Sequence, residues 1–456
     1  MSTIANDTQQ KAQIFVDGRL AGVLINSGQD WQFQYLPSYQ DKEHPVSLLL
    51  PVVPTVYHSK KLFSYFEGLF VEGWQKAQLE KAFGPQTLME TLLYRCAHSV
   101  GDVQIGPWGR DQPPSEKFAS LPTAQPKLDS PPELCLYCLK KIEPLTGYEY
   151  HRECSKTFFG QEIPPQFNFA KEDLPQISLK SLSSGITIPG VQQKVSMAYG
   201  FNHYSYIIKP QVQGVKEIPE LENLWMSFAE VLGLIPALHG LCRLKDHSLA
   251  YITLRFDRTP EGRIHVEDFS QLMEKTTYEN DKYESSYLDV AKALERWLIY
   301  RLKDQKTRFF EWILFNFIFG NNDAHLKNLA LLRIPAPGKK NLINVLAPVY
   351  DLVPTAFVEE KSRQPELALP LMPGGKVRNF NRDDFLSFAK EIGIKKNAVD
   401  HFIDKLKARK PEIQELAGHS LLSAGKRLAM QKKINKRLRA LSYPDIKLEL
   451  AEASFD

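Results

Sequence analysis

Alternating apolar and polar residues at the start of the chain predict a small sheet followed by short helices. Residues 12–25, AQIFVDGRLAGVLI, contain two strand patterns joined by Asp17-Gly18, a dipeptide that favours a tight hairpin turn. The following segment WQFQYLPSY alternates aromatic and polar residues, as a half-buried strand does. The segment SYFEGLFVEGWQKAQLEKAFG predicts one or two short helices that end at Gly84. We therefore predict a small α+β subdomain over residues 1–110.

A second pattern of strands and helices follows a proline-rich linker. Residues 111–132, which include LPTAQPKLDSPPE, have many prolines and little periodicity, and they predict the linker. HYSYIIKPQ and LAYITLRFDR are typical of strands, and PELENLWMSFAEVLGL between them has the apolar spacing of a helix. From about residue 262 onward the pattern is mostly helical. We therefore expect two lobes, residues 163–260 and 261–456, with a cleft between them.

The composition limits the number of domains and the class of protein, but it does not indicate a function. At 456 residues, two to three domains are expected. With 43% hydrophobic and 24% charged residues and a net charge of +4, the chain has too small a basic excess to indicate nucleic-acid binding by itself. The start shows no signal-peptide pattern, and the longest apolar runs are far shorter than the roughly 20 residues that cross a bilayer. We expect a soluble, cytoplasmic protein without a membrane partner.

Three of the five cysteines lie close together with a histidine. The segment CLYCLKKIEPLTGYEYHREC has the spacing C-x2-C-x12-H-x2-C, formed by Cys135, Cys138, His151 and Cys154. Two close pairs of thiolate and imidazole ligands suit tetrahedral Zn²⁺, so the sequence predicts a zinc knuckle over residues 133–162. Because the protein fills all four positions, such a metal would be structural. The alternative is a group of reduced thiols near a chance histidine.

A polar stretch with candidate chemistry follows a long apolar run. After FFEWILFNFIFG comes GNNDAHLKN, in which Asp323 and Asn328 are separated by four residues, and Asp351 follows in APVYDLVPT. Protein kinases place a catalytic Asp and a metal-binding Asn at this spacing, with a second metal-binding Asp further on. The alternative is a helix-capping turn, since Asn and Asp favour such places.

Other parts of a phosphoryl-transfer site appear in the order that kinases use. Lys209 in YIIKP lies on a predicted strand, and Glu222 near the start of the next helix is placed to pair with it. TIPGVQQK, residues 187–194, is a candidate phosphate loop, and TLRFD is a candidate strand that holds adenine by its backbone. Together these parts favour the kinase interpretation over the capping turn.

The motifs TIPGVQQKVSM, YIIKP, FDR, GNNDAHLKN and YDLVPTA together resemble the HipA-like toxin kinases of bacterial toxin–antitoxin systems. The resemblance covers nearly the whole chain, and the N-terminal segment is similar to the small N-terminal subdomain of that family. It implies an α+β, two-lobed protein-kinase-like fold with a mostly helical C-terminal lobe. The cysteine knuckle is not part of the family pattern.

The resemblance implies a role for each matching residue. Asp323 would be the catalytic base or the residue that orients the acceptor hydroxyl, and Asn328 and Asp351 would hold Mg²⁺. His325 would lie beside the nucleotide, and Lys209, paired with Glu222, would contact the α- and β-phosphates of ATP. The residues implied in nucleotide binding are, over the phosphates, Pro189, Gly190, Val191, Gln192, Gln193 and Lys194, and, near the adenine, Leu254, Arg255, Phe256 and Tyr350. Thr187 stands where the family phosphorylates itself, with Ser183 and Ser184 nearby but out of register.

The resemblance also implies a biological role. It implies a serine/threonine kinase that modifies a translation protein, typically an aminoacyl-tRNA synthetase, and so arrests growth. It implies a helix-turn-helix antitoxin partner of the HipB type, with operator DNA bound through the complex. Two alternatives remain: a kinase-fold phosphotransferase acting on a small molecule, and an inert regulator that binds nucleic acid through the knuckle and basic helices such as KRLAMQKKINKRLRAL. Those basic residues are also typical of a solvated helix face.

Overall fold

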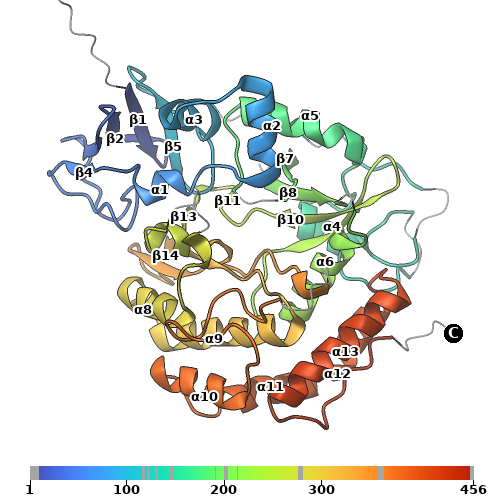
Figure 1. Ribbon diagram of the computed structural model, residues 1–456. Coiled ribbons are helices and arrows are strands. Elements are labelled where there is room, and N and C mark those ends of the chain that lie inside the picture. The colour runs from blue at the N-terminus through green and yellow to red at the C-terminus, as the bar shows by residue number, and fades with distance from the viewer. Residues whose placement is uncertain are drawn as a thin grey trace, which may run out of the picture.

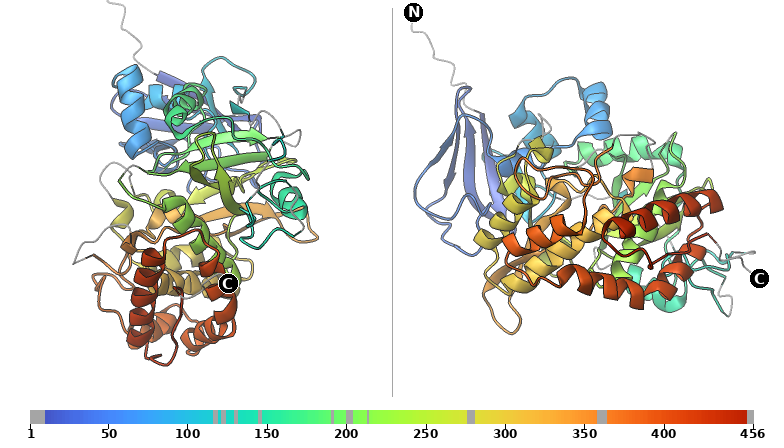
Figure 2. Two further views of the ribbon diagram at one scale, coloured as in Figure 1. Left: turned by 90° about the vertical axis from the view of Figure 1, so that its right-hand side faces the viewer. Right: turned by 60° about the horizontal axis from the view of Figure 1, so that its bottom comes forward.

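The computed structural model contains three regions that contact one another (Figures 1 and 2). In Figure 1 the N-terminal subdomain lies at the upper left, a second five-stranded sheet with its helices forms the middle lobe beside it, and a helical lobe lies below both. The structure describes residues 10–115, 119–120, 124–128, 132–143, 147–189, 192–199, 204–212, 214–275, 281–357 and 364–451.

The N-terminal subdomain consists of an antiparallel sheet in the order β4-β3-β2-β1-β5 and three helices. Its elements are β1 (Gln10–Val16), β2 (Arg19–Asn26), β3 (Trp31–Tyr35), β4 (Tyr57–Ser59), α1 (Ser64–Glu67), α2 (Gly73–Phe83), α3 (Leu88–Arg95) and β5 (Val103–Pro107). Asp17 and Gly18 both have positive φ, 48° and 72°, as a two-residue hairpin turn requires. The predicted hairpin, third strand and helix ending at Gly84 are confirmed.

The middle lobe has a sheet in the order β6-β7-β8-β10-β9, in which only the short β6–β7 pair is parallel. Its elements are β6 (Ala119–Ser120), α4 (Arg152–Phe159), η1 (Lys171–Asp173), α5 (Leu174–Ser183), β7 (Val195–Tyr199), β8 (Tyr204–Pro210), α6 (Ile218–Val231), β9 (His239–Arg243) and β10 (Leu249–Leu254). The two strands and the helix that the sequence predicted here are confirmed as β8, β10 and α6. Helix α6 packs against β9 and β10 and lies between the sheet and the helical lobe (Figure 1).

The helical lobe is organised around α9, whose side chains are buried on most sides. Its helices are α7 (Phe269–Leu272), η2 (Asp281–Tyr283), α8 (Tyr287–Trp297), α9 (Leu302–Phe319), η3 (Leu326–Asn328), η4 (Thr355–Phe357), α10 (Arg382–Glu391), α11 (Ala398–Ala408), α12 (Lys410–Gly418) and α13 (Ala424–Ala440). Two basic side chains of helix α13 make hydrogen bonds within the fold. Lys433 donates to the carbonyl of Ala356, and Arg437 donates to the carbonyl of Phe317. Among the described residues, no helix has both the length and the apolar character that crossing a membrane requires.

The helical lobe also holds strands that the sequence did not predict. β13 (His265–Asp268), β14 (Ala330–Pro335) and β15 (Leu342–Leu346) form an antiparallel sheet, and β11 (Arg258–Thr259) pairs with β12 (Gly262–Arg263). The expectation of a mostly helical second half is therefore incomplete. The reason is that β13, HVED, is polar by sequence, and its His265 and Glu267 are buried against Asp102 and Ser47 of the N-terminal subdomain.

Buried ion pairs attach the N-terminal subdomain to the rest of the chain. His265 on β13 lies between two carboxylates, with Nδ1 2.7 Å from Oδ1 of Asp102 and Nε2 2.9 Å from Oε1 of Glu267. Ser47 of the N-terminal subdomain donates to Glu267 over 2.6 Å. Burial alone would lower the pKa of His265, but Asp102 and Glu267 raise it to about 9. The imidazolium is therefore charged at neutral pH.

We expect this interface to weaken in alkali. Because the folded-state pKa of His265 is about 9, against an ordinary value of 6.5, its stabilisation is complete below about pH 6.5 and is lost as pH rises through 9. The shift corresponds to at most about 3 kcal/mol. Thermal unfolding of the wild type between pH 6.5 and 9.5 should show this loss, whereas His265→Gln should be less stable at neutral pH and lack this pH dependence. The same alkaline loss in both proteins would contradict the assignment.

Candidate active site

One cleft of about 690 Å³ lies where the three regions meet. The N-terminal subdomain contributes Gly68, Leu69 and Trp74, the middle lobe contributes residues of β8, α6 and β10, and the helical lobe contributes the loop after α9. The predicted site residues that line it are Pro189, Gln192, Gln193, Lys194, Lys209, Glu222, Leu254, Arg255, Phe256, Asp323, His325, Asn328, Tyr350 and Asp351. Gly190 and Val191 fall outside the described residues. Segments more than 160 residues apart in the sequence thus converge on one cavity.

Lys209 is at the centre of the charged part of the cleft. Its Nζ lies 2.6 Å from Oε1 of Glu222 on α6 and 2.6 Å from Oδ1 of Asp351. An ammonium group has three donors, so one remains for a further acceptor after these two bonds. Burial alone would lower the pKa of Lys209, but the two carboxylates raise it well above its usual value. The predicted pairing of Lys209 with Glu222 is therefore present in the structure.

The pKa values of the two carboxylates beside Lys209 are shifted in opposite directions. Burial would raise the pKa of Asp351, but Lys209 and Lys194 hold it well below the usual range. Burial raises the pKa of Glu222 to about 7, with Lys209 opposing that rise. Asp351 has a φ of 57°, a conformation that is uncommon for residues other than glycine and that collects at functional sites. Asp351 is thus held as a charged carboxylate beside two lysines.

The loop after α9 is held by its own hydrogen bonds. Helix α9 ends at Gly320, whose φ of 80° terminates it, and a Cβ there would lie 3.0 Å from the ring of Phe357. The side chain of Asn321 donates to Asn316, and its oxygen accepts from the amide of Asp323. The side chain of Asn328 donates to the carbonyl of Asp323 over 2.7 Å. The capping interactions considered as an alternative do occur, and they orient Asp323 and Asn328 toward the cleft.

His325 is buried and neutral in this loop. Burial, together with the nearby cation Lys282, lowers its pKa to about 3. Its Nε2 lies 4.0 Å from Oδ1 of Asp323, and its buried Nδ1 has no hydrogen-bond partner within the described part of the chain. A neutral imidazole with an unused buried nitrogen is suited to contacting a bound ligand.

Sequence reasoning missed Tyr283, which contacts the loop after α9. Its hydroxyl donates to Oδ1 of Asp323 over 2.6 Å, and its ring packs edge-on against His325 with a centroid distance of 5.0 Å. The hydroxyl of Tyr283 therefore occupies Oδ1 of Asp323. Nothing in the local sequence signals this contact, because 40 residues separate the two side chains.

Sequence reasoning also missed ion pairs that join the N-terminal subdomain to two lysines of the cleft. Glu72, just before α2, lies 2.5 Å from Nζ of Lys327 and 3.1 Å from Nζ of Lys282, and both lysines line the cleft. Burial would raise the pKa of Glu72, but the two lysines lower it below its usual value. Lys327 could have been identified as a candidate site residue, because it lies inside the GNNDAHLKN motif. No sequence motif marks Glu72.

The candidate phosphate loop lies under the N-terminal subdomain. Lys194 donates to the carbonyl of Pro189, and Gln75 of α2 donates to the carbonyl of Lys194. Burial lowers the pKa of Lys194 to about 8. Thr187 is completely buried, and its hydroxyl lies 3.4 Å from the carbonyl of Leu69.

The candidate adenine strand has fewer available backbone groups than the sequence implied. The amide of Leu254 donates to Leu238, and that of Arg255 donates to Ser205, each over 2.8 Å. The side chain of Arg255 turns to Asp257, 2.7 Å away, instead of the cavity centre. Of these three residues, Phe256 has an amide without a backbone hydrogen bond in the described structure.

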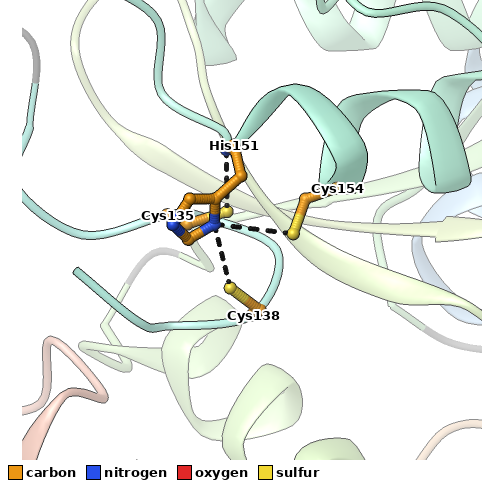
Figure 3. Close-up of side chains that lie close together, drawn as sticks. All are labelled: Cys135, Cys138, His151 and Cys154. Carbon is orange, nitrogen blue, oxygen red and sulfur yellow. Dashed lines mark hydrogen bonds between the residues drawn. The ribbon is translucent and has the colours of Figure 1, made fainter. Parts of the chain in front are cut away.

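The predicted metal knuckle brings its four side chains together (Figure 3). One ligand atom from each of Cys135, Cys138, His151 and Cys154 lies within 4.8 Å of all the others. The knuckle is at β9, on the side of the middle lobe away from the cleft residues, and it does not line the cleft.

Comparisons with known proteins agree with this arrangement. Residues 186–413 match the family model described as HipA-like C-terminal domain, and residues 12–106 match that described as HipA N-terminal domain. A Haemophilus influenzae protein named "Putative kinase" is 26% identical over 338 residues, 67% of this chain and 95% of its own length. "Putative kinase Y4mE" of Sinorhizobium fredii is 24% identical over 400 residues, 85% of this chain and 87% of its own.

A solved structure shows the same fold. A chain from the Shewanella oneidensis complex of HipA, HipB and operator DNA matches with a TM-score of 0.64 and 17% identity, over 96% of this chain and 100% of that one. The predicted two-lobed, kinase-like α+β fold is therefore confirmed. With one family model matching half of the residues and a second matching the N-terminal subdomain, this chain belongs to the HipA-like kinase family.

Proposed function

We propose that this protein is a serine/threonine protein kinase that transfers the γ-phosphate of ATP to a hydroxyl of another protein. One observation carries the proposal: Lys209, Asp323, Asn328 and Asp351 come from separate segments and line the same cleft. A phosphoryl-transfer site needs an ammonium group at the phosphates, hard oxygen ligands for Mg²⁺ and a carboxylate near the acceptor hydroxyl.

The donor groups of the cleft fit a magnesium nucleotide. Asp351 is charged, and the amide oxygen of Asn328 makes no hydrogen bond among the described residues, so both oxygens would serve as Mg²⁺ ligands. Bound Mg²⁺ would neutralise charge that develops on the phosphate oxygens. The remaining donor of Lys209 would contact the α- and β-phosphates, and His325 and Lys194 would contact the nucleotide from the loops. The amide of Phe256, with Leu254 and Tyr350 nearby, would contact the adenine.

Asp323 would act on the acceptor. In the transfer, the acceptor oxygen forms a bond to the γ-phosphorus, the bond to the bridging β,γ-oxygen breaks, and ADP leaves. Asp323 orients the acceptor hydroxyl and takes its proton, as the carboxylate near the nucleophile does in kinases. The hydrogen bond from Tyr283 supports this role, because a hydroxyl already occupies that position.

The direct test is transfer of labelled phosphate. The full chain is incubated with γ-labelled ATP and cell lysate, with Asp323→Ala as the inactive control. A labelled protein band of defined size, absent with the control, is expected. Label found only in small molecules would favour the phosphotransferase alternative. No label, with a cellular phenotype that Asp323→Ala leaves unchanged, would favour an inert nucleic-acid-binding regulator.

We propose that the biological role follows that of the family. The complex of HipA, HipB and operator DNA supports a helix-turn-helix antitoxin partner of the HipB type for this chain, with DNA bound through the complex. The protein substrate would be a cytoplasmic translation protein such as an aminoacyl-tRNA synthetase, and its modification would arrest growth. Phosphoproteomics after a brief pulse of expression, with Asp351→Ala as the control, would identify it.

Thr187 is the proposed site of self-phosphorylation. Its hydroxyl is buried under Leu69, so the loop must leave this position before Thr187 can accept phosphate. A phosphate there would add roughly two negative charges and compete with the phosphates of ATP. Thr187→Ala should abolish self-labelling and leave ATP binding within about twofold of wild type, whereas Ser184→Ala should change neither. Phosphate mapped only to Ser183 or Ser184 would contradict the assignment.

The knuckle is proposed to hold structural Zn²⁺. A tetrahedral ion with Zn–S of about 2.3 Å and Zn–N of about 2.0 Å separates its ligand atoms by roughly 3.5–3.8 Å. Nδ1 of His151 lies 3.3 Å from Sγ of Cys138 and 3.6 Å from Sγ of Cys154, close to those values. Nε2 of His151 lies 2.8 Å from the carbonyl of Lys141, a bond that leaves the lone pair on Nδ1 for a metal.

A further inference from the structure

We infer that the metal in the knuckle is required for nucleotide binding. The knuckle packs against the sheet that carries Lys209, on the face opposite to the cleft, and this layer is called the rear wall below. This inference rests on the proposed zinc site and adds a role for it. Residues 107–185 lie outside both family matches, so the family relationship assigns no role to the Cys/His knuckle, which is residues 133–143 and 147–154.

The knuckle is built to bring its ligands together. Leu139 has a φ of 57°, and the amide of Cys135 donates to the carbonyl of Lys140, which closes the turn between the first two cysteines. The amide of His151 lies 3.4 Å from Sγ of Cys135. Helix α4 begins immediately after His151 and places Cys154 in its first turn (Figure 3). A metal bound to all four ligand atoms would join the two halves of the knuckle directly.

The knuckle is attached along β9, the edge strand of the middle-lobe sheet. The amide of Leu241 donates to the carbonyl of Leu136 over 2.8 Å, and the hydroxyl of Tyr150 donates to the carbonyl of Leu241 over 2.6 Å. Gly240 allows this close approach, since a Cβ there would lie 3.1 Å from the carbonyl oxygen of Leu136. The knuckle therefore covers an edge that would otherwise expose unpaired backbone groups.

A salt bridge reinforces this attachment. Arg243 of β9 donates through Nε to Oε1 of Glu149 over 2.6 Å, and the side chain of Glu149 is almost fully buried. The amide of Leu136 donates to the carbonyl of Glu149, so this residue joins both halves of the knuckle to the edge strand. Displacement of the knuckle would leave the carboxylate of Glu149 without its cation.

The knuckle and α4 also supply about a third of the buried core behind the sheet. One buried cluster joins Cys135, Leu136, Ile142, Tyr150, Phe158 and Phe159 to residues of β7, β8, β9 and β10. The hydroxyl of Tyr206 on β8 donates to the carbonyl of Phe158 over 2.8 Å. Loss of the knuckle fold would therefore expose the apolar rear face of these strands to water.

Only the thickness of the sheet separates this core from the cleft. On β8, Tyr206 and Ile208 belong to the rear core, whereas Ile207 and Lys209 line the cleft. On β10, Ala250 and Ile252 face the rear, whereas Tyr251 and Thr253 line the cleft. Because successive residues of a strand point to opposite faces, a shift of the rear core moves the cleft residues with it. Lys209 depends on this support for its position between Glu222 and Asp351.

We expect loss of the metal to weaken nucleotide binding through the packing of the rear wall. The knuckle halves are too short to bury a core of their own, so the free energy of metal binding contributes directly to their folding. Without the metal, the thiols lose their common partner, and the packing behind β8 and β10 loosens. The expected consequence is weaker binding of Mg²⁺-ATP, although no knuckle residue touches the cleft.

The test uses the full chain purified under reducing conditions. Bound metal is measured by elemental mass spectrometry, and binding of a non-hydrolysable ATP analogue is measured by calorimetry in excess Mg²⁺. About one Zn²⁺ per chain is expected. A zinc-selective chelator should weaken analogue binding by at least about tenfold and lower the thermal midpoint, and added Zn²⁺, but not further Mg²⁺, should restore both.

Variants distinguish the effect of losing the metal from the effect of losing one thiol. Cys138→Ser should behave like the chelated protein, whereas His151→Cys, which leaves four thiolates, should keep both the metal and analogue binding. Cys96→Ser is the matched control, because Cys96 is a buried thiol in the N-terminal subdomain, outside the cluster. It should retain the metal and bind the analogue with unchanged affinity.

Three outcomes would overturn the inference, and they differ in what else they remove. A reduced protein that contains no metal would refute the zinc site. A protein that loses its Zn²⁺ and binds the analogue as before would refute the role of the rear wall and leave the proposed kinase function intact. A zinc-loaded protein that binds no analogue would refute both this inference and the proposed function.

Discussion

Replacing Asp351 with asparagine should lower the rate of phosphate transfer by about three orders of magnitude. The substitution keeps the shape of the side chain but removes the charge that would hold Mg²⁺ and that lies 2.6 Å from Lys209. Metal ions contribute several kcal/mol of transition-state stabilisation, and each 1.36 kcal/mol corresponds to a factor of ten in rate. The measurement is single-turnover transfer from γ-labelled ATP, either to Thr187 or to a protein acceptor.

The fold should tolerate this change, because Lys209 keeps its partner Glu222. The matched control is Asp404→Asn, which neutralises a largely exposed carboxylate on α11, far from the cleft, and should leave the rate unchanged. If Asp351→Asn transferred phosphate within tenfold of the wild-type rate, the assignment of Asp351 as a metal ligand would be wrong.

Replacing Asp257 with asparagine should destabilise the attachment of the N-terminal subdomain by about 3–5 kcal/mol. Asp257 is buried and accepts hydrogen bonds from Arg255 at 2.7 Å, Arg258 at 2.7 Å and the amide of Gly101 at 2.9 Å. Burial would raise the pKa of Asp257, but the two guanidinium groups hold it well below its usual range. Without this charge, two buried cations face each other without compensation.

The effect should appear first at the contact between the subdomain and β11. Arg258 also donates to the carbonyls of Ser99 and Gly101 in the N-terminal subdomain, so Asp257 orients the arginine that joins the two regions. A chain with several regions does not unfold in one step, so the measurement is limited proteolysis together with the first thermal transition. The control Asp30→Asn removes a surface pair with Lys60 and should change stability by less than about 1 kcal/mol. Equal protease resistance of Asp257→Asn and wild type would contradict the prediction.

Features that depend on neighbours in the sequence were predictable. The hairpin at Asp17-Gly18 follows from a turn that requires positive φ at both residues, and α6 follows from its apolar spacing. The convergence of Cys135, Cys138, His151 and Cys154 followed from the spacing of two ligand pairs around a turn. The order of Lys209, Asp323 and Asp351 along the chain was enough to predict a common cleft, though not the contacts inside it.

Contacts between distant segments were not predictable from one sequence. The pairing of Glu72 with Lys282 and Lys327 joins residues more than 200 positions apart. The bond between Tyr283 and Asp323 depends on how the segment before α8 lies over the loop after α9.

By itself, then, the sequence determined the local elements, the order of the site residues and the ligand spacing of the knuckle, because propensity, periodicity and turn chemistry act over a few residues. Only the tertiary structure decided that β13 to β15 form a sheet, that Thr187 is buried, that the side chain of Arg255 contacts Asp257, and that the knuckle packs behind the strand carrying Lys209. The physical reason is that burial and ion pairing depend on which segments, far apart in the sequence, come into contact in the folded chain. No local sequence pattern determines those contacts.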